Sequence, residues 1–411
     1  MSKETRSLSK LVLSIAPSQT LEITAMAKQM RADGLDVIGF AAGEPDFDTP
    51  QNIKDAAIRA IQMGFTKYTP AAGTNQLREA VAHSLKERHD LDYKPEQIIV
   101  SNGAKHSLFN TFQTILNFYD EVLIMRPYWL SYPELVKLAG GMPVYVDVYQ
   151  ENNFEPRPED IERMITDRTK AIIVNNPSNP CGTTYKEETL KAIADIAIRH
   201  DLFIISDEIY GDLVYDGKSH NSIAHFSHNV YDHTIVINGL SKSYAMTGWR
   251  IGYSACIPEI AKHMASLQSH AASNACSIAQ YAAVEALTGP QDDLYRMRDE
   301  FDRRRKEMVK LLREIPGVTC AMPEGAFYVM MNIREFKGKS FNGRVIHNSK
   351  DFTQLLLESA MVAVVPGSAF GGDDFVRLSY ATSMDNIKTG LERIRKFCMS
   401  LEDGKPMYMQ P

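Results

Sequence analysis

The segment TIVINGLSKSYAMTGWRIGY, residues 234–253, is the stretch of sequence that decides the fold. It opens with a continuous apolar run, 234–237, as expected for a strand buried on both faces of a parallel sheet. Lys242 follows, and partial burial after such a strand favours the neutral amine, which is nucleophilic. Arg250 stands before a second apolar strand and offers a forked, permanently charged donor to an anion. The alternative interpretation is two solvated basic residues beside a loop.

Outward from this segment, short apolar strands alternate with helical patterns. The strand candidates are residues 98–100, 121–125, 144–148, 170–174, 202–206 and 234–237. Residues 186–199 form a helical pattern between strands, and the run 108–116 has apolar residues spaced for one buried helical stripe. This alternation of strands and helices predicts an α/β fold.

The sequence pattern changes near residue 290. A long, highly charged helical pattern at 292–313 precedes an apolar segment at 326–331, a loop rich in Gly, Lys and Asn, and a final helix near 385–400. We therefore predict three units. They are an N-terminal segment that packs with the small domain, residues 1–48, a large ligand-binding domain, 49–290, and a small α+β domain, 291–411.

Composition excludes several classes of protein. Of the 411 residues, 44% are hydrophobic and 23% are charged, as in ordinary globular proteins. The formal net charge of -6 gives no broad attraction to nucleic acid or to an anionic membrane. The five cysteines are scattered and form no CxxC pair, which argues against a disulfide framework or a zinc site. We expect a cytoplasmic protein that binds no metal, no nucleic acid and no membrane.

Polar residues follow four of the predicted strands at their carboxyl ends. The four segments are 102–105, 175–182, 207–210 and 241–242. Open α/β sheets bind ligands at this edge, so the four together predict a site. The turn SNGAKHSLFN, 101–110, opens a helix whose free N–H groups can hold an anion, although a plain helix start is the alternative. The usual markers of nicotinamide, nucleotide-triphosphate, zincin and serine-hydrolase sites are absent.

The segment SKSYAMTGWRIGY resembles the pyridoxal-phosphate signature of fold-type I, class I aminotransferases. The chain also contains segments that resemble other motifs of this family, in the same order: AAGEPDFDTP, KYTPAAG, RPYWLSYPE, NNPSNPCG, SDEIY and VRLSYATS. The similarity is closest to the bacterial aspartate aminotransferase branch. It implies a mostly parallel central sheet sandwiched by helices, a smaller α+β domain, and a homodimer with a shared active site.

The resemblance also implies the reaction, in which the amino group of L-aspartate or a similar amino acid passes to 2-oxoglutarate through a pyridoxamine phosphate intermediate. Lys242 is implied to hold pyridoxal phosphate as an aldimine and then to move the α-proton. Asp207 is implied to keep the ring nitrogen protonated, and Tyr210 and Asn179 to hydrogen-bond the ring oxygen. A capping acid, a core tyrosine and a turn asparagine are the alternatives.

Further cofactor contacts follow from the same resemblance. Trp129 is implied to stack on the ring, although a lone tryptophan is more often a core residue. Tyr68 is implied to reach the phosphate bound by the neighbouring subunit, with an ordinary surface aromatic as the alternative. The residues expected around the phosphate are Gly103, Ala104, Lys105, Ser241 and Arg250.

Substrate contacts are implied in the same way. Arg377 is expected to bind the α-carboxylate bidentately with Asn179, Trp129 and the backbone near Gly43, rather than to be a salt-bridged surface arginine. The residues expected to receive the distal carboxylate are Lys105, Ser18, Thr20 and, from the partner subunit, Asn274. Lys105 serving only the phosphate is the alternative.

Two positions depart from the family pattern, and because of them the resemblance determines the substrate less closely. The phosphate turn reads GAKH, so His106 stands where similar enzymes more often carry glutamine, and Gly239 stands where many carry a phosphate-binding serine. Other activities therefore stay open: an aminotransferase for aromatic, alanine, methionine or prephenate-type substrates, or a pyridoxal-phosphate-dependent C–S lyase. Two further alternatives are a regulator that binds the cofactor only as a ligand and a catalytically inactive homologue. A regulator would normally need an added basic DNA-binding domain. An inactive homologue would not need to keep Lys242, Asp207, Tyr210, Arg250 and Arg377 together.

Overall fold

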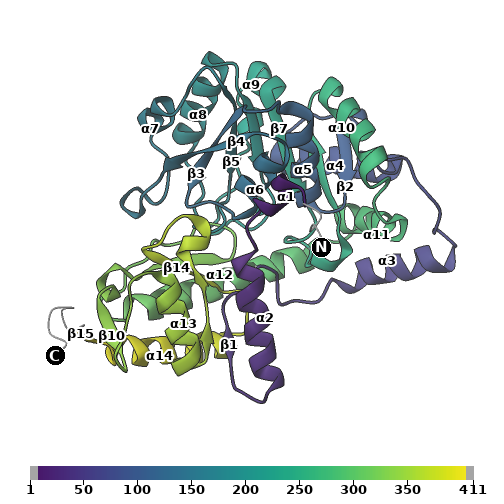
Figure 1. Cartoon of the computed structure of the whole chain (residues 1–411). Coiled ribbons are helices and arrows are strands. Elements are labelled where there is room, and N and C mark those ends of the chain that lie inside the picture. Colours follow the sequence, from purple (N-terminus) through teal and green to yellow (C-terminus); the bar gives the residue numbers. More distant parts are fainter. Residues whose placement is uncertain (1–7, 404–411) are drawn as a thin grey trace, which may run out of the picture.

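A seven-stranded sheet forms the centre of the larger part of the protein in the computed structural model, which describes residues 8–403 (Figure 1). The order is β2-β8-β7-β6-β5-β3-β4. The strands β3 to β7 run parallel, and β8 runs antiparallel to both of its neighbours. Their bounds are β2 Ile98–Ser101, β3 Glu121–Arg126, β4 Met142–Asp147, β5 Thr169–Asn175, β6 Phe203–Asp207, β7 Thr234–Gly239 and β8 Gly252–Ala255. Each predicted strand is present, and the α/β prediction is confirmed.

Helices cover both faces of this sheet, which explains why its strands are apolar without alternation. In β5, Ala171 and Ile173 pack with α5, α6 and α10, whereas Ile172 and Val174 pack with α7 and α8 on the opposite face. A further cluster joins α3, α4 and α11 to the β2 side. The bounds are α3 Gln51–Gln62, α4 Asn75–His89, α5 Ala104–Ile115, α6 Ser131–Leu138, α7 Pro158–Arg163, α8 Glu187–Arg199, α9 His228–His233, α10 Pro258–Ala271 and α11 Ser277–Thr288.

The remaining part is built on a three-stranded antiparallel sheet of order β13-β14-β9. Its apolar face packs with α12, α13 and α14 in one large core. The bounds are α12 Asp292–Arg313, β9 Tyr328–Asn332, α13 Ser349–Ala360, β12 Val362–Ala363, β13 Val365–Pro366, β14 Phe375–Ser379 and α14 Met384–Met399. A small outer sheet contains β10 Lys339–Phe341, β11 Arg344–Val345 and β15 Glu402–Asp403.

Most of the N-terminal segment, shown in purple in Figure 1, lies along this smaller part, whereas its first helix lies against α6. It contains α1, Lys10–Leu13, α2, Gln19–Ala32, and the short strand β1, Ile38–Gly39, which pairs in parallel with β12. The division into units at residues 48 and 290 remains our proposal, and residues 1–7 and 404–411 of its outer units lie outside the described range. Among the described residues, no helix has the length and apolar character needed to cross a membrane.

Candidate active site

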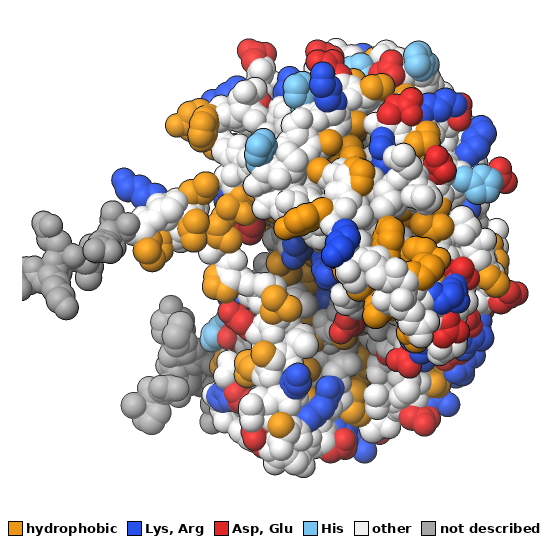
Figure 2. Space-filling view, turned by 90° about the vertical axis from the view of Figure 1, so that its right-hand side faces the viewer, with side chains coloured by type: hydrophobic (Ala, Val, Ile, Leu, Met, Phe, Trp, Pro, Cys, Tyr) orange, Lys and Arg blue, Asp and Glu red, His pale blue; other side chains and the backbone are white. Residues whose placement is uncertain are grey.

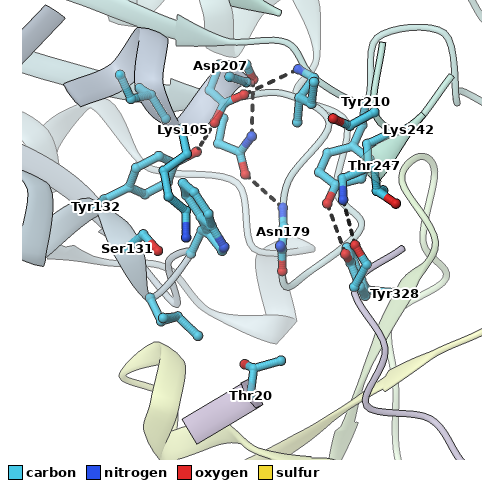
Figure 3. Close-up of a pocket in the computed structure, with 18 of the residues that line it drawn as sticks. Thr20, Lys105, Ser131, Tyr132, Asn179, Asp207, Tyr210, Lys242, Thr247 and Tyr328 are labelled. Carbon is cyan, nitrogen blue, oxygen red and sulfur yellow. Dashed lines mark hydrogen bonds between the residues drawn. The ribbon is translucent and has the colours of Figure 1, made fainter. Parts of the chain in front are cut away.

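The candidate site is a cavity of about 300 Å³ at the carboxyl ends of β5, β6 and β7, closed below by α2 and the smaller sheet (Figure 3). Most of the predicted site residues line it. They are Ser18, Thr20, Gly43, Ala104, Lys105, Trp129, Asn179, Asp207, Tyr210, Ser241, Lys242, Arg250 and Arg377. The lining therefore holds four basic side chains and a single carboxylate, so the cavity suits anions.

Lys242 lies in the turn after β7, and its side chain points into the cavity. Its Nζ donates a hydrogen bond to the Gly43 carbonyl at 2.6 Å. Burial lowers the pKa of Lys242 to about 8, and the positive charges of Arg377 and Arg250 add to this effect. A substantial fraction of the amine is therefore neutral near pH 8, as a nucleophile or a general base requires.

Asp207 ends β6 and is buried beneath the cavity. Tyr132 Oη donates to its Oδ2 at 2.6 Å, and the Ile209 N–H donates to its Oδ1 at 3.3 Å. Desolvation raises the pKa of Asp207 to about 6 despite these hydrogen bonds. Because burying this charged carboxylate is unfavourable, a cation bound next to it in the cavity would be stabilised.

Arg377 reaches the cavity from β14 in the smaller sheet and is only 2% exposed. It donates through Nη1 to Asn179 Oδ1 at 3.0 Å and through Nη2 to the Ala41 carbonyl at 3.1 Å. Its Nε has no partner among the described residues, and none of their carboxylates pairs with it. A buried guanidinium without an acidic partner needs an external anion, so the salt-bridged surface alternative is excluded.

The Asn179 contact is itself held by the loop after β5. The Asn179 N–H donates to Asn175 Oδ1 at 2.8 Å, and Asn175 Nδ2 donates to the Asp207 carbonyl at 3.1 Å. The Asn179–Pro180 peptide bond in this loop is cis. One chain of hydrogen bonds therefore joins Arg377 to the end of β6.

The N-terminus of α5 faces Arg250 and forms the turn that the sequence predicts to bind an anion. Gly103 has φ +85° and sits so close to Arg250 that an added Cβ would lie 2.3 Å from Nη2. Arg250 donates to the carbonyls of Thr247 and Asn102 at 2.9 and 3.3 Å. The His106 N–H already donates to the Gly103 carbonyl, but the N–H groups of Ala104 and Lys105 have no backbone acceptor among the described residues. These two groups and Arg250 can therefore share an anion.

The Gly239 departure has a steric cause. Gly239 pairs with Gly252 across β7 and β8, and a Cβ at Gly239 would lie 2.9 Å from the Gly252 Cα. A Cβ at Gly252 would in turn lie 2.2 Å from the Ala104 backbone nitrogen. The sheet therefore approaches the start of α5 backbone to backbone, and a serine at position 239 would push these segments apart.

The second departure, His106, lies outside the cavity lining. Its Nδ1 accepts a hydrogen bond from the Asn102 backbone N–H at 3.2 Å. The side chain thus ties the turn before α5, and its burial lowers the pKa of His106.

The outer end of the cavity holds Lys105, whose Nζ lies 5.0 Å from the centre of the Trp129 ring. Burial lowers the pKa of Lys105, and the charge of Arg250 adds to the shift. Thr20 contributes a buried hydroxyl that has no partner among the described residues. Ser18 and Thr20 come from the start of α2, so this end contains donors from both parts of the protein.

Three predicted residues are not brought into this cavity. Gly103 shapes the turn behind it, whereas Tyr68 is 92% exposed and does not line the cavity of its own chain. The side chain of Asn274 donates to the Ala275 carbonyl at 2.7 Å. The roles of Tyr68 and Asn274 toward a second subunit remain predictions.

Sequence reasoning assigned no role to several residues that the structure brings to the cavity. Tyr132 and Asn175 lie within quoted motifs, RPYWLSYPE and NNPSNPCG, so their motif membership could have marked them. Tyr328 lies in the apolar segment 326–331 and had no such signal. The other such lining residues are Leu21, Leu108, Leu130, Ser131, Ile209 and Thr247.

Comparison with known proteins agrees with this geometry. A sequence model of the family described as aminotransferase class I and II matches residues 35–394. The chain belongs to this family. The aspartate aminotransferase of Bacillus subtilis (strain 168) is 50% identical over 390 residues, which are 95% of this chain and 98% of that protein. The aspartate/prephenate aminotransferase of Cereibacter sphaeroides is 46% identical over 396 residues, covering 96% and 99%.

A solved structure gives the same result for the fold of this aminotransferase. The Thermus thermophilus aspartate aminotransferase with maleate superposes with a TM-score of 0.90 at 42% sequence identity, covering 95% of this chain and 100% of that one. The predicted family and the fold-type I architecture are confirmed.

The buried Asp207 leads to a prediction about the stability of the cofactor-free aminotransferase. Because the folded pKa, about 6, lies above the ordinary value of 3.8, folding favours the protonated acid. The stabilisation is present below pH 4 and is lost as pH rises through 6. Asp207→Asn should therefore raise the free energy of unfolding at pH 8 by roughly 3 kcal/mol. Urea denaturation at pH 8 and at pH 4 measures this gain.

The gain from Asp207→Asn should be absent at pH 4, where the native acid is already protonated. Asp195→Asn, at an exposed position of α8, is the matched control and should change little at either pH. Equal effects of Asp207→Asn at both pH values would contradict the proposed cost of burying the charge.

Proposed function

We propose that this aminotransferase uses pyridoxal phosphate to move the amino group of L-aspartate to 2-oxoglutarate. The observation that carries the proposal is that one cavity holds both the Lys242 amine, with its lowered pKa, and the buried Arg377 guanidinium, which has no acidic partner among residues 8–403. An amine nucleophile and an anchor for a carboxylate are what an amino-acid substrate requires. The names of the relatives supply aspartate as the substrate.

The residues of the cavity fit the cofactor. The start of α5, with Gly103, and the Arg250 side chain would hold its phosphate, because both offer donors with no acidic partner among the described residues. Asp207 would lie at the ring nitrogen, because burial raises the pKa of its carboxyl group and a protonated ring nitrogen beside it would offset the cost of that burial. When bound, the cofactor supplies an aldehyde for the amino group and a ring that accepts electrons from the α-carbon. Tyr210, Asn179, Trp129 and Ser241 would complete the contacts.

Each residue then has a defined part in the reaction. Arg377 binds the substrate α-carboxylate with Asn179 and fixes the α-carbon near Lys242. Lys242 Nζ would accept the proton from that carbon and hold it for return to the bound substrate. Asp207, held by the Tyr132 hydroxyl, keeps a positive charge at the far end of the cavity favourable. Closure of the smaller part over the cavity would exclude water while the proton moves.

Lys105 is our candidate for the distal carboxylate of the substrate. It lies at the outer end of the cavity beside Trp129, and the partnerless hydroxyl of Thr20 and the Ser18 side chain complete a polar set. A dicarboxylic substrate spans from Arg377 to this end with a cation at each carboxylate. Amino acids with apolar side chains would leave the Lys105 charge partly desolvated and unpaired.

We further propose a cytoplasmic homodimer with a shared active site. The support is the exposed Tyr68 in a family motif and the exposed apolar side chains Ile58, Ile61 and Met63 on or next to α3. Sedimentation of the purified protein as a monomer would count against the dimer, and cell fractionation tests the location.

A visible absorbance spectrum is the direct test of the function. Purified protein with pyridoxal phosphate should show a visible band that fades when L-aspartate is added and returns with 2-oxoglutarate. L-Aspartate and L-glutamate should react with kcat/KM at least about tenfold above alanine, methionine and aromatic amino acids. A protein that stays colourless would contradict the cofactor proposal.

The competing activities give different results in the same assay. Preference for prephenate or phenylpyruvate as amino acceptor would favour the aspartate/prephenate or aromatic alternative. Release of a thiol from a sulfur-containing amino acid, without need for a keto acid, would favour a C–S lyase.

A further inference from the structure

Tyr328, the first residue of β9, lies beside Arg377 because of the strand register. Tyr328 pairs with Ser379 of β14, whereas Arg377 pairs with Met330. Side chains two residues apart on a strand share one face, so Tyr328 and Arg377 are diagonal neighbours on the same face of the sheet. An aromatic ring and a long side chain reach each other across such a diagonal.

The contact fixes the plane of the Arg377 guanidinium. Its Cζ lies 4.3 Å from the centre of the Tyr328 ring and 4.8 Å from that of Phe370. All three side chains are buried. Stacking of this kind orients a guanidinium without using its N–H groups. The Nε group, which has no hydrogen-bond partner in the described part of the chain, therefore stays available to a ligand.

The hydroxyl of the same tyrosine contacts the larger part of the protein. Tyr328 Oη lies 2.9 Å from Tyr210 Oη, and Figure 3 shows this contact at the edge of the cavity. Burial raises the pKa of both phenols, and the Arg377 charge opposes the rise in both. The Arg377 Cζ lies 4.3 Å from the centre of the Tyr328 ring, so its charge acts directly on that phenol. Either hydroxyl can donate in this pair. We take Tyr328 as the donor because the Arg377 cation lies on its ring, which leaves the Tyr210 proton for a partner in the cavity.

We propose that Tyr328 is a positioning residue that couples the carboxylate anchor, Arg377, to the cofactor-facing hydroxyl of Tyr210. Its ring orients Arg377 and its hydroxyl strengthens Tyr210 as a donor. Because Tyr328 belongs to the smaller sheet and Tyr210 follows β6, the pair also joins the two parts across the cavity. The inference rests on the proposed function and extends it to a residue that contacts other side chains rather than the reacting atoms.

Two substitutions separate the two roles. Tyr328→Phe removes only the hydroxyl, and Tyr328→Leu removes the ring as well. The matched control is Tyr380→Phe, a buried tyrosine next to β14 whose hydroxyl donates to the Ala326 carbonyl at 3.2 Å and which does not line the cavity. The readouts are the pH midpoint of the bound cofactor's visible spectrum and the dissociation constant of succinate, measured by calorimetry on the cofactor-loaded protein. The melting temperature of each variant checks its fold.

Tyr328→Phe should raise the spectral midpoint by roughly 0.5 to 1 pH unit, because a weaker Tyr210 donor favours the protonated form. Its succinate dissociation constant should change less than about threefold, since the ring remains on Arg377. Tyr328→Leu should weaken succinate binding by about tenfold or more. Tyr380→Phe should match the wild type in both measurements.

The failures of the two proposals can be told apart. If the wild type binds cofactor and Tyr328→Phe titrates like the wild type, the coupling to Tyr210 is wrong. Unchanged succinate binding by a folded Tyr328→Leu variant would show that the Tyr328 ring does not orient Arg377. If that variant does not fold, the Tyr328→Phe titration still tests the coupling of Tyr328 to Tyr210. A wild type that binds no pyridoxal phosphate overturns the proposed function and this inference with it.

Discussion

Lys242→Ala is expected to lower the transamination rate by at least about three to four orders of magnitude, because one side chain supplies both the nucleophile and the proton carrier. Neither function has a substitute nearby, since Lys105 lies at the outer end of the cavity and the other two basic residues that line it are arginines. Single-turnover kinetics with L-aspartate and a stoichiometric cofactor would measure the loss.

The fold of the Lys242→Ala protein should be intact. Burial of a lysine with a lowered pKa disfavours the folded state below its ordinary pKa of 10.5, and this cost is complete once pH falls below about 8. The cofactor-free variant should therefore be at least as stable as the wild type at pH 7. Lys191→Ala, on the exposed side of α8, serves as the control for removing a lysine. A Lys242→Ala protein with unchanged turnover would refute the central role of this residue.

Arg377→Lys is expected to lower kcat/KM for L-aspartate by about two to three orders of magnitude. Lysine keeps the charge but cannot donate bidentately to a carboxylate or stack on Tyr328 in the same way. Thermal denaturation gives a second readout. Succinate should raise the melting temperature of the wild type and have much less effect on the variant.

The control for this prediction is Arg334→Lys, at an exposed arginine paired with Asp374 at 2.8 Å. Exposed ion pairs contribute little, so this variant should behave as the wild type in both measurements. Equal stabilisation of Arg377→Lys and the wild type by succinate would mean that the carboxylate binds elsewhere.

The central sheet could be predicted from sequence because its signal is local. Each parallel strand is buried on both faces, as Ile172 and Ile173 of β5 illustrate, so burial leaves a continuous apolar run. The same logic located the polar strand ends, because Asp207 and Lys242 follow such runs directly. The short pairing of β1 with β12 has no comparable pattern, since it joins two residues from each of two distant segments.

The parts of the site that sequence reasoning missed depend on tertiary register. Tyr328 sits in an apolar segment like any core aromatic, and its role arises only because β9 pairs with β14 so that Arg377 lies on the diagonal. Gly239 is a similar case, in which the sequence revealed a departure from the family but not the approach of Gly252 that explains it. Periodicity reports burial, whereas such contacts depend on which strands become neighbours.

The close approach of Gly239, Gly252 and Gly103 has a consequence for changing this enzyme by mutagenesis. Gly103 lies in the turn before α5, and Gly252 and Gly239 lie behind that turn; at each position an added methyl group would overlap neighbouring atoms. Libraries aimed at new substrates should leave them unchanged and vary the outer end, where Ser18, Thr20 and Lys105 line open space. Such variants would keep the proposed phosphate-binding turn unchanged while their selectivity among amino-acid substrates changes.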